Sequence, residues 1–250
     1  MLRFDAHGLG DSEGGGENEF LEDYFGAVEQ GKFVGDAAAA MGWLEREVRI
    51  RRFVLAGLCG GAITGLLAGA AAPRVGGLLG IGIPVILNGS GIDPVAHMPK
   101  EELASIRKMY LGRIAKPGAW ARFFTMRSNY RVLFKSLFIR GRFWAGSNSV
   151  GPRPEKAPGS GGGDNTNPLF APALHRMLEE GKRVFLIFGE ADRLYFEFKE
   201  KYLERHGERL QRFGDFFALV TVDQANHLFT FKKWQEVLFT KTLSWLAAFP

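Results

Sequence analysis

Residues 52–62 read RFVLAGLCGGA, and this stretch decides the expected fold. The apolar run at 52–56 predicts a short buried strand, and the small residues at 60–72 predict a helix packed closely against a sheet. Between the two lies Gly57-Leu58-Cys59-Gly60-Gly61, which is the G-x-S-x-G pattern of a nucleophile elbow with cysteine in place of serine. Because the strand has to turn sharply into the helix, we expect Gly57 and Gly61 to be small so that the two elements do not collide.

The position of Cys59 at the start of the predicted helix suggests a chemical role. Unpaired N–H groups at a helix N-terminus favour a thiolate, and the N–H of Gly60 is the predicted oxyanion donor. The alternative is a structural cysteine, since free cysteine is often a small buried residue in a tight turn. The elements around Cys59 favour the elbow interpretation.

The rest of the chain alternates predicted strands and helices. Residues 1–4 read as the end of a strand and 20–47 as helical. Further strands are predicted at 76–87, 183–188 and 216–222, and further helices at 172–180, 196–211 and 234–249. Such alternation predicts the α/β class, with a mostly parallel sheet flanked by helices. We divide the chain into a first core part (1–98), an inserted lid with its linker (99–168) and a second core part (169–250).

Two side chains after the later strands complement the elbow. Asp192 follows the strand at 183–188, and His227 follows the strand at 216–222. Parallel sheets gather functional groups at the carboxyl ends of their strands, and the chain order nucleophile, acid, histidine suits an elbow enzyme. The sequence therefore predicts a triad of Cys59, Asp192 and His227. Taken singly, Asp192 could instead cap a helix and His227 could be a surface-loop histidine.

Composition limits the other classes of site. Cys59 is the only cysteine, so no internal disulfide forms, and the scattered histidines predict neither a metal site nor a cofactor. His175 and His206 lie on predicted helices among charged residues, where we expect them to be solvated. We see no signal-peptide pattern in the first residues, and no apolar run reaches the ~18–20 residues that span a bilayer. These features predict a cytoplasmic protein.

The predicted lid is basic. Residues 103–154 carry eleven Lys and Arg and no Asp or Glu, in a chain of net charge +5. Residues 101–143 are helical and aromatic, and 145–168 form a Gly- and Pro-rich linker. We expect an ordinary lid that shapes a pocket for a small-molecule acyl substrate. Contact with a membrane surface through the basic face is the alternative. No nucleic-acid motif is present, so we predict no nucleic-acid partner.

Four segments together resemble a known superfamily. RFDAHGLGDSEG (3–14), GLCGGA (57–62), FGEADRL (188–194) and ANHLFT (225–230) are similar to the strand-four loop, elbow, acid and histidine regions of α/β-hydrolases. With the insert MYLGRIAKPGAWARFF (109–124), they resemble the exosortase A system-associated hydrolases of bacteria, which occur with exopolysaccharide gene clusters. The resemblance implies an α/β-hydrolase fold with a helical lid, and hydrolysis of esters or thioesters, with acyl transfer as a variant.

One departure from that family concerns the start of the chain. The loop that begins at Arg3 follows the fourth strand in the superfamily, so the resemblance implies that three strands and the loop with the second oxyanion donor are missing. We expect a truncated sequence in which Met1 is an internal methionine. The sheet should then have about five strands, with an open edge at the strand ending at Phe4. The alternative is a degenerate, non-catalytic binding or scaffold protein.

Overall fold

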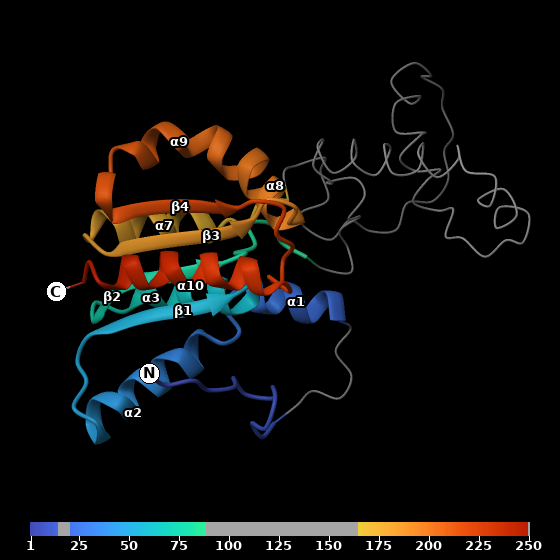
Figure 1. The fold of residues 1–250 in the computed structure, drawn as a ribbon. Helices are drawn as coiled ribbons and strands as arrows, with labels where there is room; N and C mark the ends of the chain where they lie inside the picture. The colour runs from blue at the N-terminus through green and yellow to red at the C-terminus, as the bar shows by residue number, and fades with distance from the viewer. Residues whose placement is uncertain (15–20, 89–164, 250) are drawn as a thin grey trace, which may run out of the picture. The chain divides into compact units, whose positions relative to one another are not determined.

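A computed structural model describes residues 1–14, 21–88 and 165–249 (Figure 1). Its strands are β1 (Phe53–Leu58), β2 (Val75–Ile81), β3 (Arg183–Gly189) and β4 (Phe217–Val222). Its helices are α1 (Leu21–Glu29), α2 (Val34–Glu47), α3 (Gly60–Ala71), α7 (Phe170–Glu179), α8 (Arg193–Phe198), the π-helix η1 (Lys199–Leu203), α9 (Glu204–Gln211), the 3-10 turn η2 (Gly214–Phe216) and α10 (Lys232–Leu246).

The four strands form one parallel sheet in the order β1-β2-β3-β4. Helices pack on both of its faces, so the predicted α/β class with a parallel sheet is confirmed (Figure 1). Because every strand runs in the same direction, all four carboxyl ends meet at one edge of the sheet, where Cys59 follows β1.

The strand predicted at the start of the chain is wrong. Residues 1–4 form no strand and are exposed, because nothing pairs with them to make a ladder. The sheet therefore has four strands within the described residues rather than about five, and β1 rather than the segment ending at Phe4 forms that edge.

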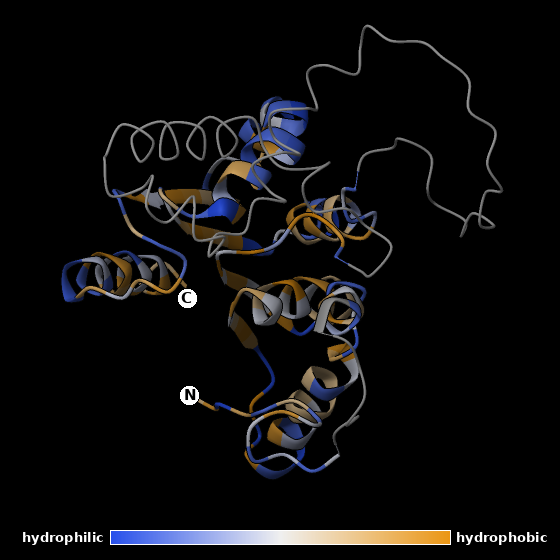
Figure 2. Cartoon of the chain, turned by 90° about the vertical axis from the view of Figure 1, so that its right-hand side faces the viewer, coloured by the Kyte–Doolittle hydropathy of each residue, from blue (hydrophilic) through white to orange (hydrophobic). Residues whose placement is uncertain are grey.

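Alternate side chains of the strands enter two separate hydrophobic clusters. On β3, Val184, Leu186 and Phe188 pack into the first cluster, with α3 and α7, while Phe185 and Ile187 pack into the second, with α10. This alternation follows from the two-residue period of a strand. Both faces of the central strands are apolar, as the orange strands in Figure 2 show.

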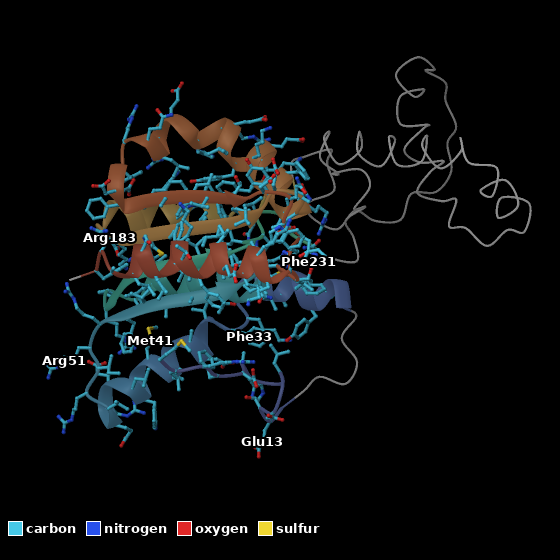
Figure 3. The ribbon with its side chains drawn as sticks, viewed as in Figure 1. Glu13, Phe33, Met41, Arg51, Arg183 and Phe231 are labelled. Atoms are coloured by element: carbon cyan, nitrogen blue, oxygen red, sulfur yellow. The ribbon has the colours of Figure 1, made fainter. Side chains whose placement is uncertain are left out.

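The predicted helix at 20–47 is two helices. Gly31 has φ +99°, a conformation that favours glycine, and the chain turns there before α2 begins. Phe33 and Met41 then pack with the first cluster (Figure 3). The break places α1 beside the elbow, since an added Cβ on Gly60 would lie 3.0 Å from Val28 Cγ1.

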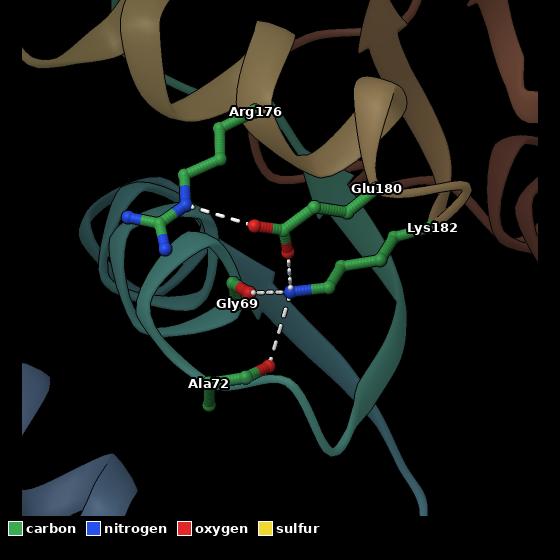
Figure 4. Close-up of polar contacts among 5 residues, drawn as sticks. All are labelled: Gly69, Ala72, Arg176, Glu180 and Lys182. Atoms are coloured by element: carbon green, nitrogen blue, oxygen red, sulfur yellow. Dashed lines mark hydrogen bonds and ion pairs between the residues drawn. The ribbon is translucent and has the colours of Figure 1, made fainter.

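A buried lysine holds the far end of α3. Lys182 Nζ donates to the carbonyls of Gly69 (2.8 Å) and Ala72 (3.1 Å) and pairs with Glu180 at 2.7 Å (Figure 4). The last carbonyls of a helix have no partner within it, and a cation there also suits the helix dipole. Lys182 thus fixes the helix that begins at Cys59.

The chain separates into two units, residues 1–90 with 165–250, and residues 91–164. The second unit lies outside the described residues, as does the predicted lid with its linker up to residue 164, so the predicted lid and the domain boundaries stay predictions. No helix within the described residues is both long and apolar enough to cross a membrane.

Candidate active site

The elbow after β1 has the expected strained turn. Cys59 has φ +53° and ψ −117°, immediately before the first residue of α3. A Cβ on Gly57 would overlap the backbone of Gly61 and Ala62, so only glycine fits there. At Gly61, by contrast, no described atom lies within 4 Å of an added Cβ. The predicted steric need for a small residue at Gly61 is therefore wrong, because the crossing helix presses on Gly57 alone.

The backbone of Cys59 is held on both sides. Its N–H donates to the carbonyl of Ile81 (2.9 Å), at the end of β2, and its carbonyl accepts from Ala62 (2.9 Å) and Ile63 (3.2 Å). The N–H of Gly60 belongs to the first turn of α3, where N–H groups have no acceptor within the helix. The role of Gly60 as an oxyanion donor stays a prediction. The thiol itself is partly exposed.

The structure brings the three predicted triad side chains together. His227 Nδ1 lies 2.8 Å from Asp192 Oδ2, and Cys59 lies near enough to the His227 ring to raise its pKa. The side chain of Asp192 is 3% exposed and that of His227 is 31% exposed. Because one nitrogen of the ring faces the acid and the ring also reaches the thiol, the arrangement has the connectivity that a triad requires. The catalytic role of these residues stays a prediction.

The electrostatics of His227 follow from its partners. The hydrogen bond with Asp192, and next the hydrogen bond with Cys59, raise the pKa of His227 to about 10, against a smaller opposing effect of burial. Such a histidine keeps its proton at neutral pH.

Asp192 makes the contacts that both of its predicted roles require. Its Oδ1 accepts from the Leu194 N–H (3.0 Å) and caps α8, while Oδ2 holds His227. The cap fixes the carboxylate in one rotamer, so its second oxygen is aimed at the ring without further loss of side-chain freedom. The two interpretations are therefore compatible, because a carboxylate has two oxygens.

The acid and histidine loops are joined through their backbones. The N–H of Glu190 donates to Val222, and the N–H of Ala191 donates to Ala225, both at 3.0 Å. Gly189 permits this approach, since a Cβ there would overlap the Ala225 carbonyl. The loop after β3 and the loop after β4 are thus bound directly to each other.

A buried carboxylate near the elbow was not singled out from the sequence. Glu29, at the end of α1, is 4% exposed and accepts from both the N–H (2.6 Å) and the side-chain amide of Asn88. Its carbonyl accepts from Asn167 Nδ2 at 2.7 Å. Burial raises the pKa of Glu29. Glu29 therefore ties the segments on either side of residues 89–164 to α1. An isolated glutamate on a predicted helix gives no sequence signal for this role.

The expected solvation of His175 is wrong. His175 is 7% exposed, and its Nε2 lies 3.0 Å from the hydroxyl of Tyr202, whose ring also stacks with His206. Burial lowers the pKa of His175. The packing of α7 against η1 and α9 buries a residue whose charged sequence neighbours suggested exposure. His206 is partly exposed.

No group of three or more His, Cys, Asp or Glu side chains in residues 1–14, 21–88 and 165–249 is placed to hold a metal ion. The sequence matches no protein-family model. It also matches no curated protein.

Several solved structures are similar in fold. An esterase of Pyrococcus furiosus is 15% identical over 94% of this chain and 66% of that chain, with a TM-score of 0.48. A carboxylesterase of Nitrososphaera gargenis is 13% identical over 86% and 74%, with a TM-score of 0.41. The esterase domain of a Rhodothermus marinus protein is 14% identical over 85% and 67%, with a TM-score of 0.41. Likenesses with TM-scores below 0.5 establish no family and no activity for this chain.

Proposed function

We propose that this protein is a hydrolase of ester or thioester bonds that works through a Cys59-His227-Asp192 triad. One observation carries the proposal: Asp192 holds the His227 ring by a hydrogen bond, and the same ring lies near Cys59, which is held in a strained turn at a helix N-terminus. Strain at such a turn exposes the nucleophile, and the series supplies both its base and the group that orients the base.

The proposed reaction begins with a proton on His227. With the proton on His227, Cys59 Sγ attacks the acyl carbon as a thiolate, and the Gly60 N–H stabilises the resulting oxyanion. The tetrahedral intermediate collapses when His227 protonates the departing alcohol or thiol. A water molecule, deprotonated by the now neutral His227, then attacks the thioester on Cys59. Collapse of the second intermediate releases the acid and restores the thiolate and imidazolium. Asp192 stabilises the imidazolium at each stage.

A cysteine nucleophile favours activated substrates. The intermediate is itself a thioester, so thioesters, lactones and esters with good leaving groups suit the site better than amides, and transfer of the acyl group to an acceptor other than water is a variant of the same steps. The resemblance to the exosortase A system-associated hydrolases supports a role beside bacterial exopolysaccharide systems.

The test combines turnover with capture of the intermediate. Nitrophenyl acetate and an acyl thioester are offered to the protein and to its C59A and H227A variants, with the exposed-histidine variant H7A as the matched control. We expect C59A and H227A to lower kcat/KM on the order of 10⁴-fold or more, as loss of a triad member does elsewhere. We expect H7A to leave it unchanged.

Mass spectrometry of the rapidly quenched protein should find the acyl group on the Cys59 peptide. Turnover that survives C59A would assign the activity to another group. An absence of turnover and of acylation in the unaltered protein would favour a non-catalytic binding or scaffold role.

A further inference from the structure

Ile81, the last residue of β2, and Gly82, which follows the strand, both contact residues of the candidate site. The Ile81 carbonyl accepts from the Cys59 N–H (2.9 Å), and the Gly82 N–H donates to the Ile187 carbonyl of β3 (2.8 Å). The α-carbon of Gly82 lies against His227 and Asp192. One short stretch of backbone therefore holds the nucleophile and supports the pair that activates it.

Gly82 has no room for a side chain. Its φ is +53°, and an added Cβ would lie 2.9 Å from both Nδ1 and Cε1 of His227 and 3.2 Å from Asp192 Oδ2. Contacts between nonbonded heavy atoms are favourable only near ~3.5–4.0 Å, so a methyl group there forces the ring and carboxylate to move. The ring cannot simply rotate away, because the hydrogen bond to Asp192 fixes Nδ1.

The surroundings make the direction of that movement specific. Asp192 accepts from the Leu194 N–H and is 4% exposed, so it yields little, whereas His227 has a partly exposed side chain on a loop. The backbone of Cys59 is bound to Ile81. A side chain at position 82 should therefore displace His227 rather than Asp192 or Cys59.

We propose that Gly82 is a positioning residue of this site: its bare α-carbon lets the His227–Asp192 pair close on the end of β2 and so sets the separation between imidazole and thiol. This proposal rests on the proposed function, because it concerns the same thiol and imidazole. It also offers a structural reason for a glycine that the elbow motif does not explain.

Strand β2 provides a matched control. Gly76 lies in β2, the strand that Gly82 directly follows. It has no positive φ and would place a Cβ no closer than 3.9 Å to any described atom outside its chain neighbours. G76A thus tests the general effect of alanine in β2, while G82A adds crowding against His227 and backbone strain.

The experiment uses iodoacetamide, because Cys59 is the only cysteine and its alkylation needs no substrate. Rates are measured from pH 6 to pH 9 for the unaltered protein, G76A, G82A and H227A. A simple thiol is only a few per cent ionised at pH 7, so loss of the paired imidazole should slow alkylation at that pH on the order of tenfold. We expect G82A and H227A to share the pH profile of a simple thiol, and G76A to keep the original profile.

The double variant separates positioning from general damage. If Gly82 acts through His227, G82A should slow alkylation little further in an H227A background, and it should lower the melting temperature less there than in the unaltered protein. The proposal would be overturned if G82A slowed alkylation equally in the unaltered and H227A backgrounds, or if it prevented folding in both. It would also be overturned if G82A kept the pH profile of the unaltered protein. Should coupling be found without any turnover of esters or thioesters, the proposed function fails while the positioning role of Gly82 stands.

Discussion

The two faces of the sheet differ in how completely they are covered. On the first, α3 and α7 bury side chains such as Leu66 and Phe188 to 0% exposure. On the second, α10 is the covering helix among the described residues, and its Phe239 and Leu243 remain 62% and 66% exposed. The β1 residues Leu58 and Val54, in register with Ile81 and Gly77 on that side, are also exposed.

The candidate site joins the two faces. Cys59 follows β1 and leads into α3, whose far end is capped and whose sides are buried, whereas His227 lies on the loop that leads into α10. Cys59 is thus held by the well-packed face and His227 by the less covered one. Disturbing the second face should shift His227 relative to Cys59 before it unfolds the sheet.

The largest expected change in stability tests the difference in packing between the two faces of the sheet. F188A removes a fully buried ring that packs against Phe198 and should lower the free energy of unfolding by about 3–5 kcal/mol. F185A, on the opposite face of the same strand, should cost less, because its neighbours under α10 can relax toward solvent. Urea unfolding measures both values. A greater loss of unfolding free energy in F185A than in F188A would contradict the difference between the two faces.

The next effect concerns the capped end of α3. K182M leaves the carbonyls of Gly69 and Ala72 without their donor in a buried place and should destabilise the protein by about 1–3 kcal/mol. The control is R176M, which removes an exposed partner of the same Glu180 and should cost less than about 1 kcal/mol. Thermal unfolding compares the two variants, and equal losses would show that the cap contributes nothing beyond a surface ion pair.

A smaller effect is expected at His227, and it depends on pH. The folded pKa of about 10 lies above the ordinary value of 6.5, so the stability that its hydrogen bonds contribute is fully present below pH 6.5 and is lost as the pH rises through about 10. Because the side chain is partly exposed, we expect roughly 1 kcal/mol. Unfolding of the protein and of H227Q at pH 6, 8 and 10.5 measures the difference, which should be greatest at pH 6. A difference that grows with pH would contradict this assignment.

The smallest effect is expected on the outside of α10. F239S replaces an exposed ring and should change the free energy of unfolding by less than about 0.5 kcal/mol. Chemical denaturation measures the free energy of unfolding of F239S, and the value for F188A is measured in the same way for comparison. A loss above 1 kcal/mol would mean that this helix face is covered in the protein as it folds in solution.

Local sequence determined the elements and most of their order. The run RFVLA, the small residues of α3 and the run RVFLIF predicted β1, α3 and β3 to within a few residues, because hydrophobic periodicity and glycine placement act locally. The places of Cys59, Asp192 and His227 after their strands were predictable for the same reason. Residues 1–4 were predicted wrongly, since a strand exists only where a neighbour pairs with it.

Only the tertiary structure decided which of these residues touch. Three such contacts join segments that are far apart in the chain. A side chain fits at Gly61 but not at Gly57, Asp192 both caps α8 and holds His227, and Gly82 lies against the His227–Asp192 pair. The burial of His175 and Glu29 could not be predicted from the sequence either, because burial depends on which helix packs against a residue and not on its sequence neighbours. Sequence periodicity specifies which face of an element is apolar, whereas contact distances arise only when the elements pack.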